Sequence, residues 1–368
     1  MRIFLMGYPG DLGGACTEAW ATIKLWRQFG VDVHLVPTWG CDLRWRQRCD
    51  ALGCTTHDAT DQTLHQVPGL AGSVVVAFCN SAFLATAHKL RELNCRLVFC
   101  NCMTWLFNAE REFCKAHGPF DAYMFQSEFQ RSMLEPELTQ FGYKPEQGHL
   151  IRGAFELDGW TFSPRPHAKG EPFVVGRAAR PDKDKWSSNT WSIYQRIQYR
   201  HKRALMLGMD EKTREKLGRP PAWADCLQPM ALSAQDFFRQ LHCMLPINGG
   251  ARENWPRVGL EAMAAGVPIV AQDQWGWKEM IQHGVTGFLG DCDEELAHFA
   301  AVLAYDEELR LEIARAARRR LVDELAHPDV LWAGWRRLFQ SLGEHVSGVP
   351  GIPDAHTFHG TQTEEVAA

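Results

Sequence analysis

The sequence lacks the patterns that mark a secreted, metal-binding or membrane-spanning chain, although it runs to 368 residues. No two of its cysteines have the C-x-x-C spacing, and no block of cysteine and histidine has the spacing of a zinc site. No apolar run approaches the roughly 20 residues that span a bilayer. Residues 1–8 have the pattern of a buried strand without a cleavable signal. We therefore expect no metal site and no transmembrane segment.

A strong charge of either sign is also absent. Lys and Arg number 39 against 44 Asp and Glu, a net charge of −5, which excludes a globally basic nucleic-acid binder. Two segments, residues 44–48 and 194–203, nevertheless mix cations with aromatic side chains. Such segments can hold phosphates and stack on a base, or touch an anionic membrane surface. The alternative is a solvated helix face with extended side chains, so a nucleic-acid partner and a peripheral membrane contact both stay open.

Cysteine and tryptophan, in contrast, are abundant, with 12 and 14 residues. Nine of the twelve cysteines fall in the first 114 residues, often inside apolar runs such as Val74–Cys79. Free cysteine behaves there as a small hydrophobic residue. Because scattered cysteines fit a reducing compartment better than secretion, we expect a cytoplasmic protein.

Strand and helix signals alternate along the chain, which predicts βαβ units and parallel sheets. Residues 156–172 interrupt the alternation with three prolines and two glycines, as a linker does. We therefore expect an α/β protein built from two Rossmann-like halves with a cleft between them. The expected parts are an N-terminal domain over 1–155, a linker over 156–171, a C-terminal domain over 172–326, a helix over 327–342 and a disordered tail over 343–368.

The most informative segment runs from Leu245 to Leu289. Glu253 and Glu261 are separated by seven residues, and a helix-then-strand pattern, a Gly-x-x-Glu ending at Glu279 and a His-Gly-x-Thr-Gly run follow in order. In these features the segment resembles the C-terminal domain of retaining GT-B glycosyltransferases, a family that includes sucrose synthases and many bacterial glycan-building enzymes. The resemblance implies a GT-B fold whose C-terminal helix crosses back to the first domain. It also implies a nucleotide-sugar donor, most often a UDP-sugar, and neither metal nor cofactor.

The resemblance assigns the donor sugar to Glu253 and the nucleotide ribose to Glu261. The physical pattern agrees, because a turn-rich loop opens there onto a helix, whose N-terminus suits a diphosphate. The alternative is that both are ordinary carboxylates at a helix start and on a helix surface. Where the family often has Gly-Phe-Gly, this chain has Asn254, Trp255 and Pro256.

Proline has no N–H to offer the ligand. We expect Asn254 or Arg257 to compensate, with Val258 and Gly259 completing the donor-binding turn. Trp255, Trp275 and Trp277 lie within this motif, which favours a reshaped sugar pocket.

The first strand of the second half ends at Arg177, and Lys183 and Lys185 follow within eight residues. Family members place an Arg and a Lys there on the donor diphosphate, which indicates Arg177 together with Lys183 or Lys185. Two cations would clamp the negative charge that grows on the leaving group. The alternative is a solvated charged loop, and the spacing does not choose between the two lysines.

In the first half, glycines surround the strand-to-helix turn without the G-x-G-x-x-G spacing, and the second strand ends in Val36-Pro37-Thr38 with no ribose-binding acid. An NAD enzyme is therefore disfavoured. The resemblance brings Gly13 and Gly14 close to the donor phosphate and the acceptor. A tight turn that needs positive φ is the alternative.

The loop after the fourth strand lacks the histidine that the family frequently carries near the sugar. We expect Asn101 or Thr104 to supply polar contacts on the acceptor side, or else a buried loop without a catalytic role.

The sequence thus predicts a retaining glycosyl transfer from a nucleotide sugar to a glycan or lipid-linked glycan. Hydroxymethylated bases of phage-type DNA and small molecules stay open as acceptors. A sugar-nucleotide epimerase and a non-enzymatic glycan-binding protein remain as rival functions.

Overall fold

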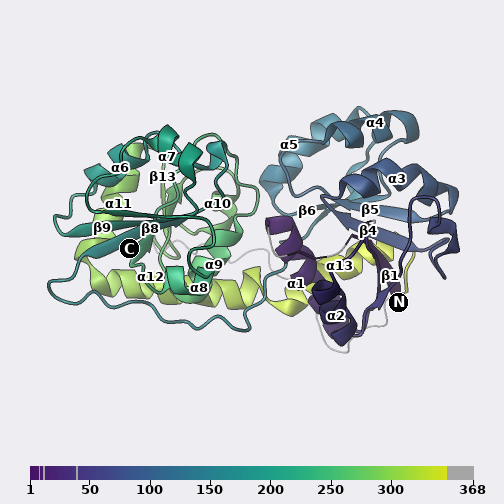
Figure 1. The fold of residues 1–368 in the computed structure, drawn as a ribbon, viewed down its shortest axis with the longest axis horizontal. Coiled ribbons are helices and arrows are strands. Elements are labelled where there is room, and N and C mark those ends of the chain that lie inside the picture. Colours follow the sequence, from purple (N-terminus) through teal and green to yellow (C-terminus); the bar gives the residue numbers. More distant parts are fainter. Residues whose placement is uncertain (8, 11–12, 39, 346–368) are drawn as a thin grey trace, which may run out of the picture.

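The computed structural model describes residues 1–7, 9–10, 13–38 and 40–345. Two α/β domains lie side by side, each a parallel sheet covered by helices (Figure 1). The predicted α/β architecture of two Rossmann-like halves is confirmed. Most of the expected tail, from residue 346 onward, lies outside the described residues.

The first domain is a seven-stranded sheet in the order β3-β2-β1-β4-β5-β6-β7, with every neighbouring pair parallel. Its strands are apolar runs because helices cover both faces; all five residues of β4 are buried. The strands are β1 (Arg2–Met6), β2 (Asp32–Val36), β3 (Thr55–Thr56), β4 (Val74–Phe78), β5 (Arg96–Cys100), β6 (Ala122–Phe125) and β7 (Gly148–Leu150). The helices are α1 (Gly14–Gln28), α2 (Leu43–Ala51), α3 (Ser81–Glu92), α4 (Asn108–His117) and α5 (Glu128–Thr139).

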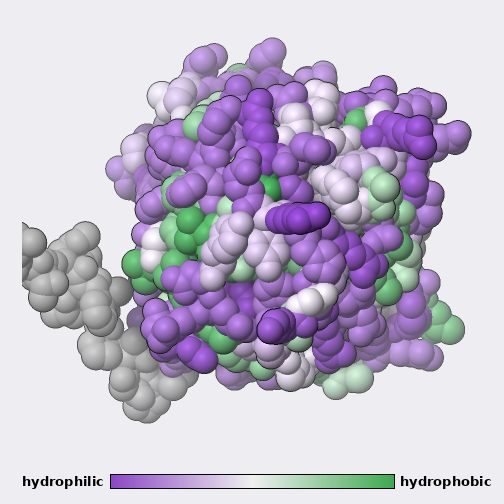
Figure 2. All heavy atoms as spheres, turned by 90° about the vertical axis from the view of Figure 1, so that its left-hand side faces the viewer, coloured by the Kyte–Doolittle hydropathy of each residue, from purple (hydrophilic) through white to green (hydrophobic). Residues whose placement is uncertain are grey.

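The second domain holds a four-stranded sheet in the order β10-β9-β8-β11 and a pair, β12-β13, joined to it by a bridge between Met244 and Ile269. The strands are β8 (Phe173–Ala178), β9 (Lys202–Leu207), β10 (Ala224–Leu227), β11 (Cys243–Met244), β12 (Val270–Gln272) and β13 (Phe288–Gly290). The helices are α6 (Thr190–Arg196), α7 (Glu211–Leu217), α8 (Ala234–Phe238), α9 (Arg257–Ala265), α10 (Gly276–Met280), α11 (Asp293–Tyr305) and α12 (Glu307–Arg320). The face turned away from the first domain is largely hydrophilic (Figure 2).

The last helix, α13 (Pro328–Ser341), returns to the first domain and packs beneath its sheet (Figure 1). Trp335 meets Trp26 of α1 edge-on with ring centres 4.8 Å apart, and Trp332 stacks on Phe29 at 5.1 Å. These aromatic contacts bury the apolar face of α13. No helix within the described ranges is long and apolar enough to cross a bilayer.

Parallel strands place their carboxyl ends at one edge of each sheet, and ligands of such folds bind there. In this molecule the two carboxyl edges face one another. Helix α10 lies against α5, and the loops after β1, β5 and β6 meet the loop that precedes α9.

Candidate active site between the domains

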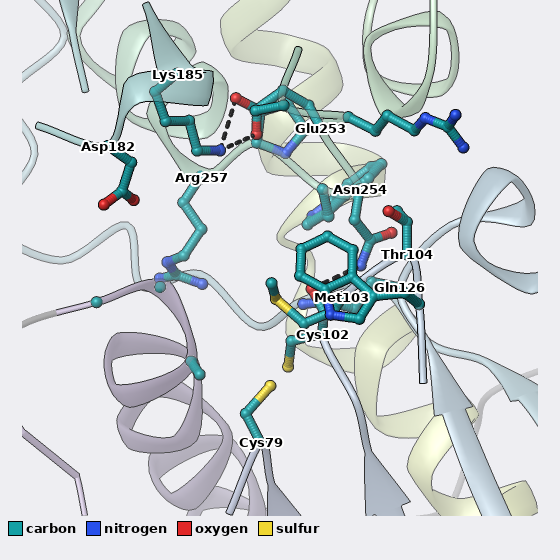
Figure 3. A pocket seen from close by; sticks show the side chains of 18 of the residues that line it. Cys79, Cys102, Met103, Thr104, Gln126, Asp182, Lys185, Glu253, Asn254 and Arg257 are labelled. Carbon is teal, nitrogen blue, oxygen red and sulfur yellow. Dashed lines mark hydrogen bonds and ion pairs between the residues drawn. The ribbon is translucent and has the colours of Figure 1, made fainter. Parts of the chain in front are cut away.

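A cavity of about 990 Å³ lies between the two carboxyl edges. It is lined from the first domain by the turn before α1 and the loop after β5, and from the second by residues 180–185 and 250–257 (Figure 3). Its size is that of a typical small-molecule site. Within the described residues, no group of three or more His, Cys, Asp or Glu side chains could hold a metal ion.

The centre of the second-domain wall is an ion pair between Lys185 and Glu253. The Lys185 ammonium donates to both carboxylate oxygens, at 2.9 and 2.8 Å. Both side chains are largely shielded, with 24% and 14% of their surfaces exposed, yet both line the cavity. A cation and an anion are thus held next to each other where water is partly excluded. The low local dielectric constant strengthens their electrostatic interactions.

Of the two candidate lysines, the structure places only Lys185 in the cavity. Lys183 is exposed and does not line it; its carbonyl accepts a hydrogen bond of 2.6 Å from Lys216. Both belong to the same short 3₁₀ turn, Lys183–Lys185, in which successive side chains point in different directions.

Arg177, at the end of β8, lies behind this turn and not in the cavity. Its guanidinium donates to the Lys185 carbonyl and, at 2.9 Å, to Asn248 Oδ1, and it stacks on Trp186. Burial lowers the pKa of Arg177 to about 10. The prediction that Arg177 clamps the diphosphate is therefore corrected, because its guanidinium supports the backbone of Lys185 instead. Two of the guanidinium nitrogens of Arg177 have no hydrogen-bond partner.

Asn254 does not take the place of the N–H that Pro256 lacks. Its amide donates at 2.6 Å to Gln126, and its carbonyl accepts at 2.5 Å from Ser127. Gln126 in turn donates to the carboxyl of Glu18 on α1. The side chain of Asn254 therefore fastens the donor-side loop to the first domain.

Burial raises the pKa of Glu18 to about 7, opposed by the nearby Arg257 guanidinium. Arg257 begins α9, lines the cavity and donates at 2.7 Å to the carbonyl of Ala154. Trp255 also lines the cavity, with the Arg152 guanidinium 4.6 Å from its ring centre. Loop and helix start are thus anchored across the cleft at several points.

The remaining donor-site predictions lie outside the cavity lining. Glu261 is partly exposed on α9, and desolvation raises its pKa to about 7. A Cβ at Gly259 would lie 2.5 Å from the sulfur of Met280, so this glycine permits packing rather than ligand contact. Val258 packs on the second-domain core. Of the three tryptophans in the motif, Trp255 alone lines the cavity, and Trp277 is buried in that same core.

On the first-domain wall, Gly13 and Gly14 line the cavity as expected. Gly13 has φ 96° and ψ 146°, which other residues adopt only under strain. Thr104 also lines the cavity. Asn101 does not: its amide donates to Glu110 at 2.7 Å and to the Trp105 carbonyl at 3.2 Å, so it shapes the loop from within.

Two of the three aromatic side chains in the basic segments are buried. Trp45 lies under Arg48, and Arg46 pairs with Asp58. Tyr194 donates its hydroxyl to the carbonyl of Leu245 at 2.8 Å. Packing occupies both of these rings, which excludes base stacking on them, whereas Tyr199 is partly exposed beside other aromatic rings.

Three contacts around the candidate site were missed by the sequence reasoning: those of Glu18, Gln126 and Glu279. The Glu279 carboxylate accepts the backbone N–H groups of Glu128 and Phe129 at 3.0 and 2.8 Å and pairs with Arg152 at 2.6 Å. It thereby caps α5 of the other domain. The only available signal was the place of Glu279 in the Gly-x-x-Glu motif.

Comparison with known proteins agrees with this geometry. Residues 238–320 match the family model described as glycosyl transferases group 1. Over 82 residues the chain is 34% identical to N-acetyl-alpha-D-glucosaminyl L-malate synthase of Bacillus anthracis. This match spans about a fifth of either protein, 22% of each.

Two solved structures share the fold over almost their whole length. Anabaena HepE in complex with UDP-glucose is 18% identical, with a TM-score of 0.69 over 92% of this chain and 100% of that chain. Sucrose-phosphate synthase of Thermosynechococcus elongatus is 14% identical, with a TM-score of 0.68 over 93% and 100%. The chain therefore has the GT-B fold, and residues 238–320 carry the signature of the group 1 glycosyltransferases.

Proposed function

We propose that this protein is a glycosyltransferase that moves a sugar from a UDP-sugar to a hydroxyl of a glycan or lipid-linked glycan, with retention of configuration. The observation that carries the proposal is the Lys185–Glu253 pair in the cleft. Glu253 lies within the segment of group 1 signature, residues 238–320, and Lys185 lies outside it. UDP as the nucleotide is supported by the similar fold of HepE, which binds UDP-glucose.

The chemistry assigns different tasks to the two charges. As the bond from the sugar to the diphosphate breaks, negative charge grows on the departing phosphate, and Lys185 with the N-terminus of α9 stabilises it. Positive charge grows on the sugar ring, and Glu253 stabilises that. The departing phosphate accepts the proton of the acceptor hydroxyl. The hydroxyl oxygen attacks the sugar from the same face that the phosphate leaves. Neither a metal nor a cofactor takes part.

The first-domain wall receives the acceptor. Thr104 and the backbone at Gly13 and Gly14 offer polar groups there. A saccharide acceptor is supported by the similar fold of an S. aureus TarM variant, solved with alpha-GlcNAc-glycerol and UDP. We place the reaction in the cytoplasm, because all twelve cysteines are unpaired.

A product screen tests the proposal. Several UDP-sugars are offered with glycans, lipid-linked glycans or hydroxymethylated DNA, and products are identified by mass spectrometry. We expect a glycosylated saccharide. A glycosylated base would overturn the acceptor class, and a donor that is isomerised or hydrolysed without any acceptor would identify an epimerase. If no donor is bound or consumed, the function itself is wrong.

A further inference from the structure

Two thiols face one another on the first-domain wall of the cavity. Cys79 follows β4 and Cys102 follows β5, and these strands are neighbours that pair in parallel with Phe78 opposite Cys100. Both residues line the cavity, and Figure 3 shows their sulfurs turned toward each other. Continued past the strand ends, this register sets Cys79 opposite Asn101, one residue before Cys102, on strands about 4.8 Å apart. A disulfide bridges Cα separations of about 4.4–6.8 Å.

The backbone holds both thiols in this position. Cys79 and Cys102 have φ values of 44° and 59°, the left-handed region that costs a non-glycine residue on the order of 1 kcal/mol. The Cys79 N–H donates to the Cys100 carbonyl at 2.9 Å, and its thiol donates to the Asn101 carbonyl. Two strained residues at adjacent strand ends thus present sulfur to the same space.

Cys49 and Cys54 are neighbours as well, but both are buried. Cys16 also lines the cavity and is the alternative partner of Cys79. Cys79 and Cys102 are partly exposed through the cavity, so a small oxidant reaches them.

We propose that Cys79 and Cys102 are a modification site: a dithiol that hydrogen peroxide closes into a disulfide, which switches off acceptor use. In the first step the Cys79 sulfur attacks peroxide, the O–O bond breaks, and a sulfenic acid and water form. In the second step the Cys102 sulfur attacks the Cys79 sulfur, the S–O bond breaks, and a second water leaves. The two thiols lose two electrons and two protons, and peroxide takes up both.

The two side chains also interact directly. A hydrogen bond with Cys79, together with burial, raises the pKa of Cys102 well above its ordinary value.

The effect on activity rests on the proposed function. The Cys102 carbonyl accepts from Asn254 at 3.4 Å, and the next carbonyl, of Met103, accepts from Gln130 at 2.8 Å. A bond that draws Cys102 toward Cys79 pulls on this loop, which carries Thr104 into the acceptor side. Misplacement by an ångström costs about 10²-fold in turnover. Lys185 belongs to the separate turn Lys183–Lys185 on the opposite wall, away from the Asn254 contact, so we expect UDP binding to persist.

The test begins with a measurement that needs no activity. Reduced full-length protein is treated with peroxide, digested with trypsin without reductant and analysed by mass spectrometry. Trypsin leaves Cys79 on residues 49–89 together with Cys49 and Cys54, and Cys102 on residues 97–111 together with Cys100, so fragmentation of the joined peptides must locate the link. We expect the Cys79–Cys102 link in the wild type and in the control Cys292→Ser, an exposed cysteine, and its loss in Cys79→Ser and Cys102→Ser.

Failure to find this link, or a link from Cys79 to Cys16 instead, overturns the modification site whatever the protein catalyses. If the link forms, acceptor turnover should fall about 10²-fold and recover with dithiothreitol, while the affinity for UDP stays within about twofold. A cross-linked enzyme with full turnover overturns the switch alone.

Discussion

The two walls of the cleft differ in how they treat charge. The second-domain wall brings both cations and carboxylates to the cavity, with Lys185 and Glu253 paired and Arg252 and Arg257 in the lining as well. The first-domain wall contributes two carboxyls and, among the described lining residues, no lysine or arginine: Glu137 pairs with Arg111 from outside the lining, and Glu18 is buried with its pKa raised to about 7. The remaining first-wall groups are uncharged: small residues, thiols, Thr104, Gln126 and the apolar side chains of Met103, Trp105, Phe107 and Met133.

This difference teaches how one cleft can serve two substrates. A diphosphate and a developing sugar cation need fixed charges around them. An acceptor hydroxyl needs a nearly neutral surface that orients the hydroxyl and does not itself bind the charged donor. On the function proposed above, we infer from the asymmetry of charge that the second-domain wall is the donor half and the first-domain wall the acceptor half.

The strongest way to break this division is to neutralise the donor wall. Glu253→Gln should lower turnover about 10²- to 10³-fold, because the positive charge on the sugar loses its stabilising carboxylate. The matched change on the acceptor wall, Thr104→Val, should raise the KM for the acceptor and leave UDP binding intact. Steady-state kinetics with both substrates varied separates the two effects, and equal losses for donor and acceptor would refute the division.

The second prediction weakens the contact between the two domains that Glu279 makes. Glu279→Ala leaves the first N–H groups of α5 and the Arg152 guanidinium without their carboxylate. We expect the unfolding free energy to fall by about 1–2 kcal/mol. The control is Glu294→Ala, which removes an exposed pair with Arg196 and should cost less than about 0.5 kcal/mol. Urea denaturation measures both, and similar losses would show that Glu279 is not a specific link.

The last effect is a pH dependence, and it concerns the buried carboxyl of Glu18. Because its pKa is about 7 in the folded protein against 4.5 ordinarily, the folded state keeps a proton that the unfolded state releases. This contribution to stability is complete below pH 4.5 and is lost as the pH rises toward 7, with a slope of at most about 1.4 kcal/mol per pH unit.

Glu18→Gln should reduce the slope of melting curves recorded between pH 5 and 7 without abolishing it, because the pKa values of Glu110 and Glu261 are also raised to about 7. Arg111 lowers the pKa of Glu137, so Glu137→Gln should leave the slope in this range unchanged. An unchanged slope in Glu18→Gln would show that Glu18 does not keep its proton in the folded state.

Much of the fold followed from local pattern, and parts of the site did not. Alternating strand and helix signals predicted the two parallel sheets, because apolar periodicity reports local burial. The neighbourhood of Glu253 was marked by a contiguous motif. The network from Glu18 through Gln126 to Asn254 joins residues more than a hundred positions apart, and no local pattern encodes such a meeting.

The errors have equally specific causes. Arg177 was placed on the diphosphate from its position at a strand end, but the chain that follows folds over it and offers it the Lys185 carbonyl. Asn101 was expected to face a ligand, but Glu110, nine residues later, binds its amide. In both cases a later residue of the chain folds back and binds the polar group, and sequence spacing does not reveal this contact.

The central claim is that the second-domain wall binds the diphosphate through Lys185. It is tested most directly by calorimetric titration of UDP into the wild type, Lys185→Ala and Lys183→Ala. The account predicts binding by the wild type, affinity lowered about tenfold or more by Lys185→Ala, and a change below about twofold for the exposed Lys183→Ala. Equal affinities for the wild type and Lys185→Ala, or no UDP binding by the wild type, would contradict it.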